Sequence, residues 1–66
     1  MPIIHVNMLE GKSVEMKRAY VKALTDCSVE VLKCPPEAVT VILSDMAFEN
    51  YGKAGKLRLD EAGGKK

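Results

Sequence analysis

Residues 3–9 alternate between two kinds of side chain along the chain. One face of this segment is wholly apolar and consists of Pro2, Ile4, Val6 and Met8. The other face is mixed and carries Ile3, His5, Asn7 and Leu9. A period of two is that of a β-strand, in which successive side chains point to opposite faces. The pattern therefore predicts a strand with one face in a core and the other face only partly covered.

Residues 10–12 interrupt the strand-like alternation, and a helical pattern begins after them. Ser13 is a typical helix N-cap residue, and Glu15 in the first turn complements the helix dipole. Apolar side chains then recur at intervals of three and four up to about residue 33: Met16, Tyr20, Ala23, Leu24, Cys27 and Val31. The apolar sector is widened by Val21, Val29 and Leu32. This width predicts an amphipathic helix that contacts a second surface as well as a sheet.

The prolines Pro35 and Pro36 end the helix, because proline cannot continue its hydrogen bonding. Residues 38–44 are β-branched and apolar, which predicts a second, buried strand. Strand, long helix and strand form one right-handed β-α-β unit with parallel strands, so the fold class is α/β. Because two strands and one helix cannot close a core, further strands are expected from other copies of the chain.

The remainder of the chain is short and irregular. Residues 46–55 have turn chemistry, including Asn50 and two glycines, and 56–59 alternate as in a short edge strand, hairpin or arm. Residues 60–66 are polar and glycine-rich, which is typical of a flexible tail. We therefore predict a single domain over 1–66 that ends in this tail.

Composition narrows the range of partners. The chain has 66 residues, 10 Lys and Arg against 9 Asp and Glu, and only 5% aromatic residues. A net charge of +1 gives no long-range field for nucleic acid or anionic membrane, so neither partner is expected. The apolar runs are shorter than the roughly 18 residues of a membrane span, and no signal-peptide pattern opens the chain. We expect a soluble, cytoplasmic protein.

Metal and disulfide chemistry have little support in the sequence. Cys27 and Cys34 are too few for a disulfide framework, and the one histidine, His5, is distant from both in the sequence. The cysteines are interpreted as small packing residues in a reducing compartment, and His5 as a structural or surface residue. No metal and no cofactor are expected.

Pro2 is the first candidate for chemistry. Once Met1 is removed, Pro2 presents a secondary amine, and an α-amino group titrates near ~7.7–8.0 before its surroundings perturb it. Desolvation or a nearby cation would bring such an amine to the range in which a general base works well at neutral pH. A proline is also common at the start of a strand, where no backbone donor is needed. If Met1 is retained, the nitrogen of Pro2 is an amide and has no basicity.

Several features in order resemble the 4-oxalocrotonate tautomerase family. They are Pro2 at the start of the first strand, the segment Leu9-Glu10-Gly11-Lys12-Ser13, the β-branched second strand, and Met46 followed by Asn50-Tyr51-Gly52-Lys53-Ala54-Gly55. The resemblance covers residues 2 to about 59. It implies an isomerase that moves protons between carbon and oxygen in small keto and enol acids without a cofactor. It also implies a homo-oligomer, a hexamer built as a trimer of dimers.

The resemblance implies roles for four residues. Pro2 matches the general base, and Tyr51 matches an aromatic position in the wall of the active site. Lys12 lies where most members have an arginine that binds the distal carboxylate of the substrate. The ammonium group of lysine acts as a point charge, so the two parallel hydrogen bonds of a planar guanidinium are lost. Thr40 lies where the best-known members have a second arginine, supplied by a neighbouring subunit. A threonine hydroxyl donates one neutral hydrogen bond, so the departure at Thr40 implies weak activity or an altered substrate range.

Two other functions compete with a tautomerase acting on 2-hydroxydienoate or enol-pyruvate acids. One is a non-catalytic or partner-dependent paralogue, a subunit of a hetero-oligomer in which another chain supplies the missing arginine. The other is a dehalogenase or decarboxylase that uses a cationic Pro2 together with a water-activating carboxylate, for which Glu10, Asp45 and Glu49 are candidates. Sequence alone does not choose among the substrates.

Overall fold

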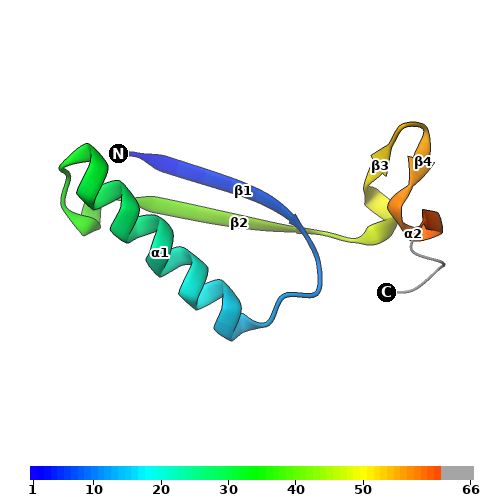
Figure 1. Ribbon diagram of the computed structural model, residues 1–66, viewed down its shortest axis with the longest axis horizontal. Helices are drawn as coiled ribbons and strands as arrows, with labels where there is room; N and C mark the ends of the chain where they lie inside the picture. The colour runs from blue at the N-terminus through cyan, green and yellow to red at the C-terminus, as the bar shows by residue number, and fades with distance from the viewer. Residues whose placement is uncertain (62–66) are drawn as a thin grey trace.

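The computed structural model describes residues 1–61, and its main body is one β-α-β unit. Strand β1 spans Ile3–Leu9, helix α1 spans Val14–Leu32, and strand β2 spans Thr40–Met46. The two strands are parallel neighbours, and α1 returns the chain across one face of the pair (Figure 1). The predicted α/β class and the parallel β-α-β unit are confirmed.

The register of the two strands sets which side chains share a face. Pairing runs without interruption from Ile3 opposite Thr40 to Leu9 opposite Met46. On the face toward α1 the side chains are half-buried: Ile4, Val6, Met8, Val41 and Leu43. On the other face, called the open face, most side chains are exposed: Ile3, His5, Asn7, Thr40 and Ile42, together with the half-buried Ser44. The wholly apolar face predicted for residues 3–9 is thus the face toward the helix.

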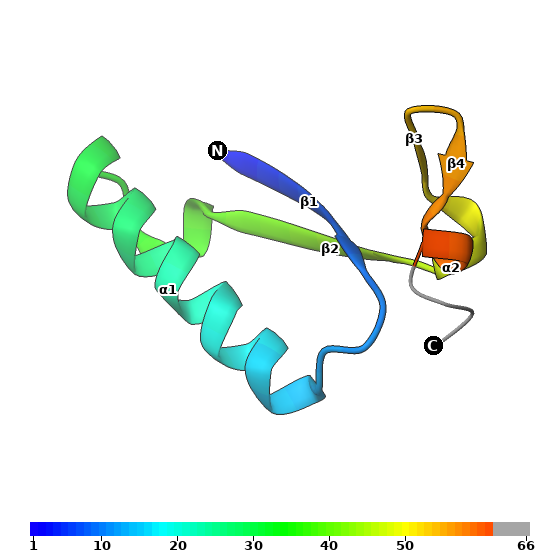
Figure 2. The ribbon, with the colours of Figure 1, turned by 45° about the vertical axis from the view of Figure 1, so that its right-hand side comes forward.

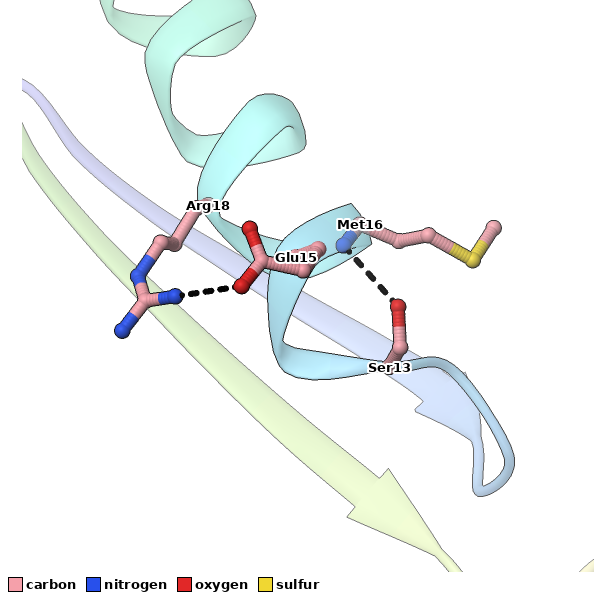
Figure 3. Close-up of polar contacts among 4 residues, drawn as sticks. All are labelled: Ser13, Glu15, Met16 and Arg18. Carbon is pink, nitrogen blue, oxygen red and sulfur yellow. Dashed lines mark hydrogen bonds and ion pairs between the residues drawn. The ribbon is translucent and has the colours of Figure 1, made fainter.

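Both ends of α1 are capped by local interactions. The Ser13 hydroxyl accepts a hydrogen bond from the backbone N–H of Met16 at 3.2 Å, as the N-cap pattern predicted (Figure 3). At the other end Lys33 adopts a left-handed conformation with φ 59°, and its N–H donates to the Val29 carbonyl at 3.0 Å. The caps satisfy backbone groups that the helix leaves unpaired and fix its length.

The orientation of α1 differs from the simplest interpretation of its apolar pattern. The less exposed sector of the helix contains Lys17, Val21, Leu24, Thr25, Ser28 and Val29. Most of the predicted stripe is exposed in the protomer: Met16, Tyr20, Ala23, Cys27 and Val31, here called the outer stripe. The outer stripe is therefore left for a second surface, as the width of the apolar sector predicted. Of the residues that widened this sector, Val21 and Val29 lie on the less exposed side of the helix, whereas Leu32 is exposed.

Strand β2 begins two residues later than the predicted 38–44. Pro36–Ala38 form a 3-10 turn, η1, in which the Ala38 N–H donates to Pro35 at 3.0 Å. Proline is well placed at the first position of such a turn because its φ is already fixed. The strand then extends to Met46, where its pairing with β1 ends.

A small C-terminal arm follows β2. It consists of the 3-10 turn η2 (Phe48–Asn50), the short antiparallel strands β3 (Gly52–Lys53) and β4 (Lys56–Leu57), and helix α2 (Arg58–Glu61). Residues 58–59, predicted as strand or arm, are helical, and so are residues 60–61 of the predicted tail. The rest of that tail lies outside the described residues. The arm projects beyond the end of the β1–β2 pair (Figures 1 and 2).

The protomer has very little interior. No hydrophobic residue of 1–61 is buried, and Ser28 alone reaches that class. The chain exposes 4944 Å², whereas a compact monomer of its mass would expose roughly 4100 Å². Its Cα radius of gyration is 15.1 Å, against about 11 Å for a compact domain of this length. Among residues 1–61 no helix is both long and apolar enough to cross a membrane.

Candidate functional site

Pro2 and Thr40 lie together at one end of the strand pair. Pro2 is half-buried just before β1, and its carbonyl accepts a hydrogen bond from the Thr40 N–H at 3.0 Å. Met1 is 76% exposed, so the peptide bond before Pro2 lies at the surface, within reach of a processing enzyme. The fold thus presents the nitrogen of Pro2 at the edge of a sheet, beside the first residue of β2.

Lys12 and Tyr51 lie toward the other end of the strand pair. Lys12 is exposed in the loop between β1 and α1, and Tyr51 is half-buried between η2 and β3. The Tyr51 carbonyl accepts a hydrogen bond from the Arg58 N–H at 2.8 Å, which closes the base of the hairpin. Figure 1 shows the N-terminus at one end of the molecule and the hairpin at the other.

The four predicted site residues are therefore not brought together in one protomer. The seven-residue strand β1 is roughly 20 Å long and separates Pro2 and Thr40 from Lys12 and Tyr51. A small substrate cannot span that distance. If all four residues serve one site, the site combines the N-terminal end of one protomer with the opposite end of another.

A hollow of about 270 Å³ lies between the end of β1 and the first turns of α1. Its lining residues are Met8, Lys12, Met16, Lys17 and Tyr20. Figure 3 shows the Met16 side chain projecting away from the exposed pair that Arg18 and Glu15 form at 2.9 Å. The hollow thus combines flexible apolar side chains with two ammonium groups, a composition suited to a short acid with an apolar chain.

Lys17 was not among the residues singled out from the sequence. Its Nζ donates to Asp45 Oδ2 at 2.6 Å, and the two side chains are 28% and 41% exposed. The pair joins the first turns of α1 to the end of β2. Helical spacing places Lys17 four residues before Val21, but the sequence does not show that this sector of α1 is the less exposed one.

His5 has a contact on the open face. Its Nε2 lies 2.8 Å from the Ser44 hydroxyl of the adjacent strand, in accord with the structural or surface role expected for it. Within residues 1–61 no three His, Cys, Asp or Glu side chains gather into a group that could hold a metal ion.

The three candidate carboxylates lie away from Pro2 of their own protomer. Asp45 is paired with Met8 in the register, Glu10 follows β1, and Glu49 lies in η2. All three therefore belong to the end of the strand pair opposite Pro2. Within one protomer none of them is placed to activate a water molecule beside the Pro2 nitrogen.

Comparison with known proteins gives consistent matches over nearly the whole chain. Residues 2–59 match the family model described as tautomerase enzyme. A probable tautomerase of Halalkalibacterium halodurans is 43% identical over 61 residues, which cover 92% of this chain and 100% of the relative. The 2-hydroxymuconate tautomerase of Comamonas testosteroni is 40% identical over 55 residues, covering 83% of this chain and 87% of that protein.

A solved structure shares the fold. A 4-oxalocrotonate tautomerase isozyme of Methylibium petroleiphilum superposes with a TM-score of 0.90 at 33% identity. The superposition covers 97% of this chain and 100% of the other. The likeness therefore includes the arm as well as the β-α-β unit.

Proposed function

Because this chain belongs to the tautomerase enzyme family, we propose that it is a cofactor-free keto–enol tautomerase of small 2-hydroxydienoate or enol-pyruvate acids. Pro2 is the general base. After removal of Met1, its secondary amine takes a proton from one position of the conjugated acid and returns it at another. The observation that carries the proposal is the place of Pro2, half-buried at the start of β1 beneath a surface-exposed Met1.

We place the complete site between copies of the chain. Pro2 comes from one protomer, Lys12 and Tyr51 come from the opposite end of another, and the Thr40 side chain that faces this Pro2 comes from a neighbouring copy, as the resemblance implies. Lys12 binds a carboxylate of the substrate, and Tyr51 forms part of the apolar wall. The assembly is a homo-hexamer, a trimer of dimers, which would cover the outer stripe of α1 and the open face of the sheet. The absence of any buried hydrophobic side chain within residues 1–61 supports an obligate assembly.

The experiment begins with the intact mass of the purified protein, which shows whether Met1 has been lost. Conversion of phenylenolpyruvate and of 2-hydroxymuconate is then followed by ultraviolet absorbance. Pro2→Ala should lower kcat by about 10²–10⁴-fold, the range for loss of a general base. His5→Gln is the matched control, because His5 lies in β1 on the open face, where its Nε2 contacts the Ser44 hydroxyl at 2.8 Å, and this variant should retain activity. Equal rates for Pro2→Ala and the parent would refute the proposal.

A non-catalytic or partner-dependent subunit is the second candidate, and Thr40 is the observation that favours it. A neutral hydroxyl at this position stabilises developing enolate charge far less than a guanidinium. Activity that appears only when a second, arginine-bearing tautomerase chain is co-expressed would identify this case. A protein that retains Met1 and is inactive with both substrates would point in the same direction.

A further inference from the structure

We propose that Arg58 is a further catalytic residue, whose guanidinium binds the reacting end of the acid: the carboxylate and the oxygen on the carbon next to it. The inference rests on the proposed function, because Tyr51 and its hairpin reach the Pro2 of another copy only in that assembly. It adds to the site a cation that the hairpin itself carries. The substrate class is that of 2-oxo and 2-hydroxy acids, whether or not they bear a second carboxylate.

The pairing of the hairpin places Arg58 beside Tyr51. Strands β3 and β4 are antiparallel, with Gly52 opposite Leu57. The Arg58 N–H donates to the Tyr51 carbonyl at 2.8 Å, so the pairing continues by one position beyond the strands. Residues directly opposite each other in an antiparallel pair point to the same face, with Cβ atoms roughly 5 Å apart. The side chains of Arg58 and Tyr51 therefore leave the hairpin on the same face.

The guanidinium of Arg58 is available to a ligand. The chain has two arginines, and the other one, Arg18, pairs with Glu15 at 2.9 Å on α1 (Figure 3). Arg58 is exposed and forms no ion pair within residues 1–61, even though Asp60 and Glu61 follow it closely in α2. A guanidinium presents a planar fork of N–H donors that matches the geometry of a carboxylate. Arg58 can thus bind an acid without first giving up a partner within the described residues.

Two lysines share the face of Arg58. Successive side chains of a strand alternate, so Lys53 lies on the same face as Tyr51, and Lys56, which pairs with Lys53, lies there too. Like charges directly opposite each other repel, and an anion bound beside them relieves that repulsion. The acidic side chains of the arm belong to η2 and α2 instead: Glu49, Asp60 and Glu61. Because these acids balance the cations of the arm, the arm has no long-range field, and an anion binds by direct contact with the cationic face.

The proposed reaction develops negative charge that a guanidinium stabilises. The Pro2 amine accepts the proton of the enol hydroxyl and returns it to a carbon of the conjugated chain, so every atom is conserved. Negative charge grows on the oxygen as the proton leaves, and a hydrogen bond from a cation stabilises that charge more than one from the neutral Thr40 hydroxyl. One arm of the Arg58 fork binds this oxygen and the other binds the adjacent carboxylate. Arg58 keeps its own protons throughout.

Turnover is the first test. Arg58→Gln removes the charge but keeps a polar side chain and the backbone N–H that closes the hairpin. It should lower kcat by about 10–100-fold with both phenylenolpyruvate and 2-hydroxymuconate, with a smaller change in KM, because the contact strengthens in the transition state. Arg58→Lys restores the charge but not the fork, so it should recover only part of the rate. Arg18→Gln is the matched control, the same substitution at the arginine that pairs with Glu15, and it should react as the parent does.

Calorimetry on the assembled protein provides a second readout that needs no turnover. Oxalate is the probe, because its two adjacent carboxylates mimic the carboxylate and the oxyanion of an enolised 2-oxo acid. Arg58→Gln should weaken oxalate binding about tenfold, the loss of one charge-assisted contact, and Arg18→Gln should leave it unchanged. The inference is overturned if the two variants bind oxalate equally. It is also overturned if Arg58→Gln slows 2-hydroxymuconate alone, since the contact would then be with the distal carboxylate.

The two proposals fail separately. If Pro2→Ala reacts like the parent while Arg58→Gln loses oxalate affinity, the proposed base is wrong and the contact of Arg58 with the acid is confirmed. If Pro2→Ala is inactive while Arg58→Gln matches Arg18→Gln in both readouts, the proposed function stands and the role of Arg58 is refuted.

Discussion

The backbone N–H of Thr40 donates to the carbonyl of Pro2 at 3.0 Å, so the first residue of β2 lies directly beside Pro2, the proposed general base. Thr40 is exposed on the open face, where its side chain is directed away from α1. A longer side chain at this position would extend toward whatever covers that face rather than into the protomer. Because of this placement, the effect of having threonine rather than arginine at position 40 can be tested without disturbing the β-α-β unit.

Thr40→Arg should raise kcat/KM for 2-hydroxymuconate if its guanidinium reaches the Pro2 amine of a neighbouring copy. One added charge-assisted contact stabilises the transition state by about 1.5–3 kcal/mol, which corresponds to a gain of roughly 10–100-fold. The double variant with Pro2→Ala must lose the gain, because a donor without the base cannot move the proton. Suppose that the variant assembles like the parent but reacts no faster with 2-hydroxymuconate or phenylenolpyruvate. That result would contradict the assignment of Thr40 to the position where other members of the family have an arginine.

The open face of the sheet provides a prediction about assembly. Ile3 and Ile42 are 57% and 44% exposed on this face, and burying them against another copy would supply apolar area that the protomer lacks. Ile42→Glu should shift the proposed hexamer toward smaller species in sedimentation velocity, because a buried unpaired carboxylate is costly. Lys22→Glu introduces the same side chain on an exposed part of α1 and should sediment like the parent protein. Equal sedimentation of both variants would show that this face is not an interface.

The N-cap of α1 provides a prediction about stability. The Ser13 hydroxyl accepts from the Met16 N–H at 3.2 Å, and removal of such a cap costs about 1 kcal/mol. Ser13→Ala should lower the free energy of unfolding by that amount per protomer, as measured by denaturant titration at fixed protein concentration. Ser13→Gly should cost only a few tenths of a kcal/mol, because glycine at an N-cap leaves the backbone accessible to water. Equal losses in the two variants would mean that the cap is not the source of the effect.

Local chemistry explains which parts of the fold could be predicted from the sequence. The alternation in β1 and the cap at Ser13 each depend on a few adjacent residues, and both are observed as predicted. The start of β2 was misplaced because apolar, β-branched residues mark a strand but not its first residue. Pro36 begins a 3-10 turn, and pairing with β1 then determines where β2 starts and ends.

The sequence could not show which of the two apolar sectors of α1 faces the sheet. The helix has two apolar sectors, and the one that contacts the sheet includes the polar residues Lys17 and Ser28, which weakens its signal. Lys17 was not singled out from the sequence, because its partner Asp45 lies 28 positions away. Pairings at such separation depend on the tertiary fold, so the hollow beside Lys12 became visible only in three dimensions.

The last prediction concerns the hairpin that carries Tyr51. Lys53 pairs with Lys56, which leaves a two-residue loop in which Ala54 and Gly55 have φ of 56° and 82°. Two successive residues with positive φ form the type of turn that favours Asn-Gly. Alanine is strained in this conformation by about 1 kcal/mol, so Ala54→Asn should stabilise the hairpin and Gly55→Ala should destabilise it by similar amounts.

Steric clash does not complicate this comparison, because a Cβ at Gly55 would meet no atom within 4 Å and the effect is therefore conformational. Hydrogen exchange of the Arg58 amide reports on the hairpin directly, since that amide donates to the Tyr51 carbonyl at 2.8 Å. Exchange should slow in Ala54→Asn and quicken in Gly55→Ala. If Tyr51 lines the site, kcat/KM should change in the same order as the protection. Unchanged protection in both variants would show that contacts with other copies, rather than the turn, hold the hairpin in place.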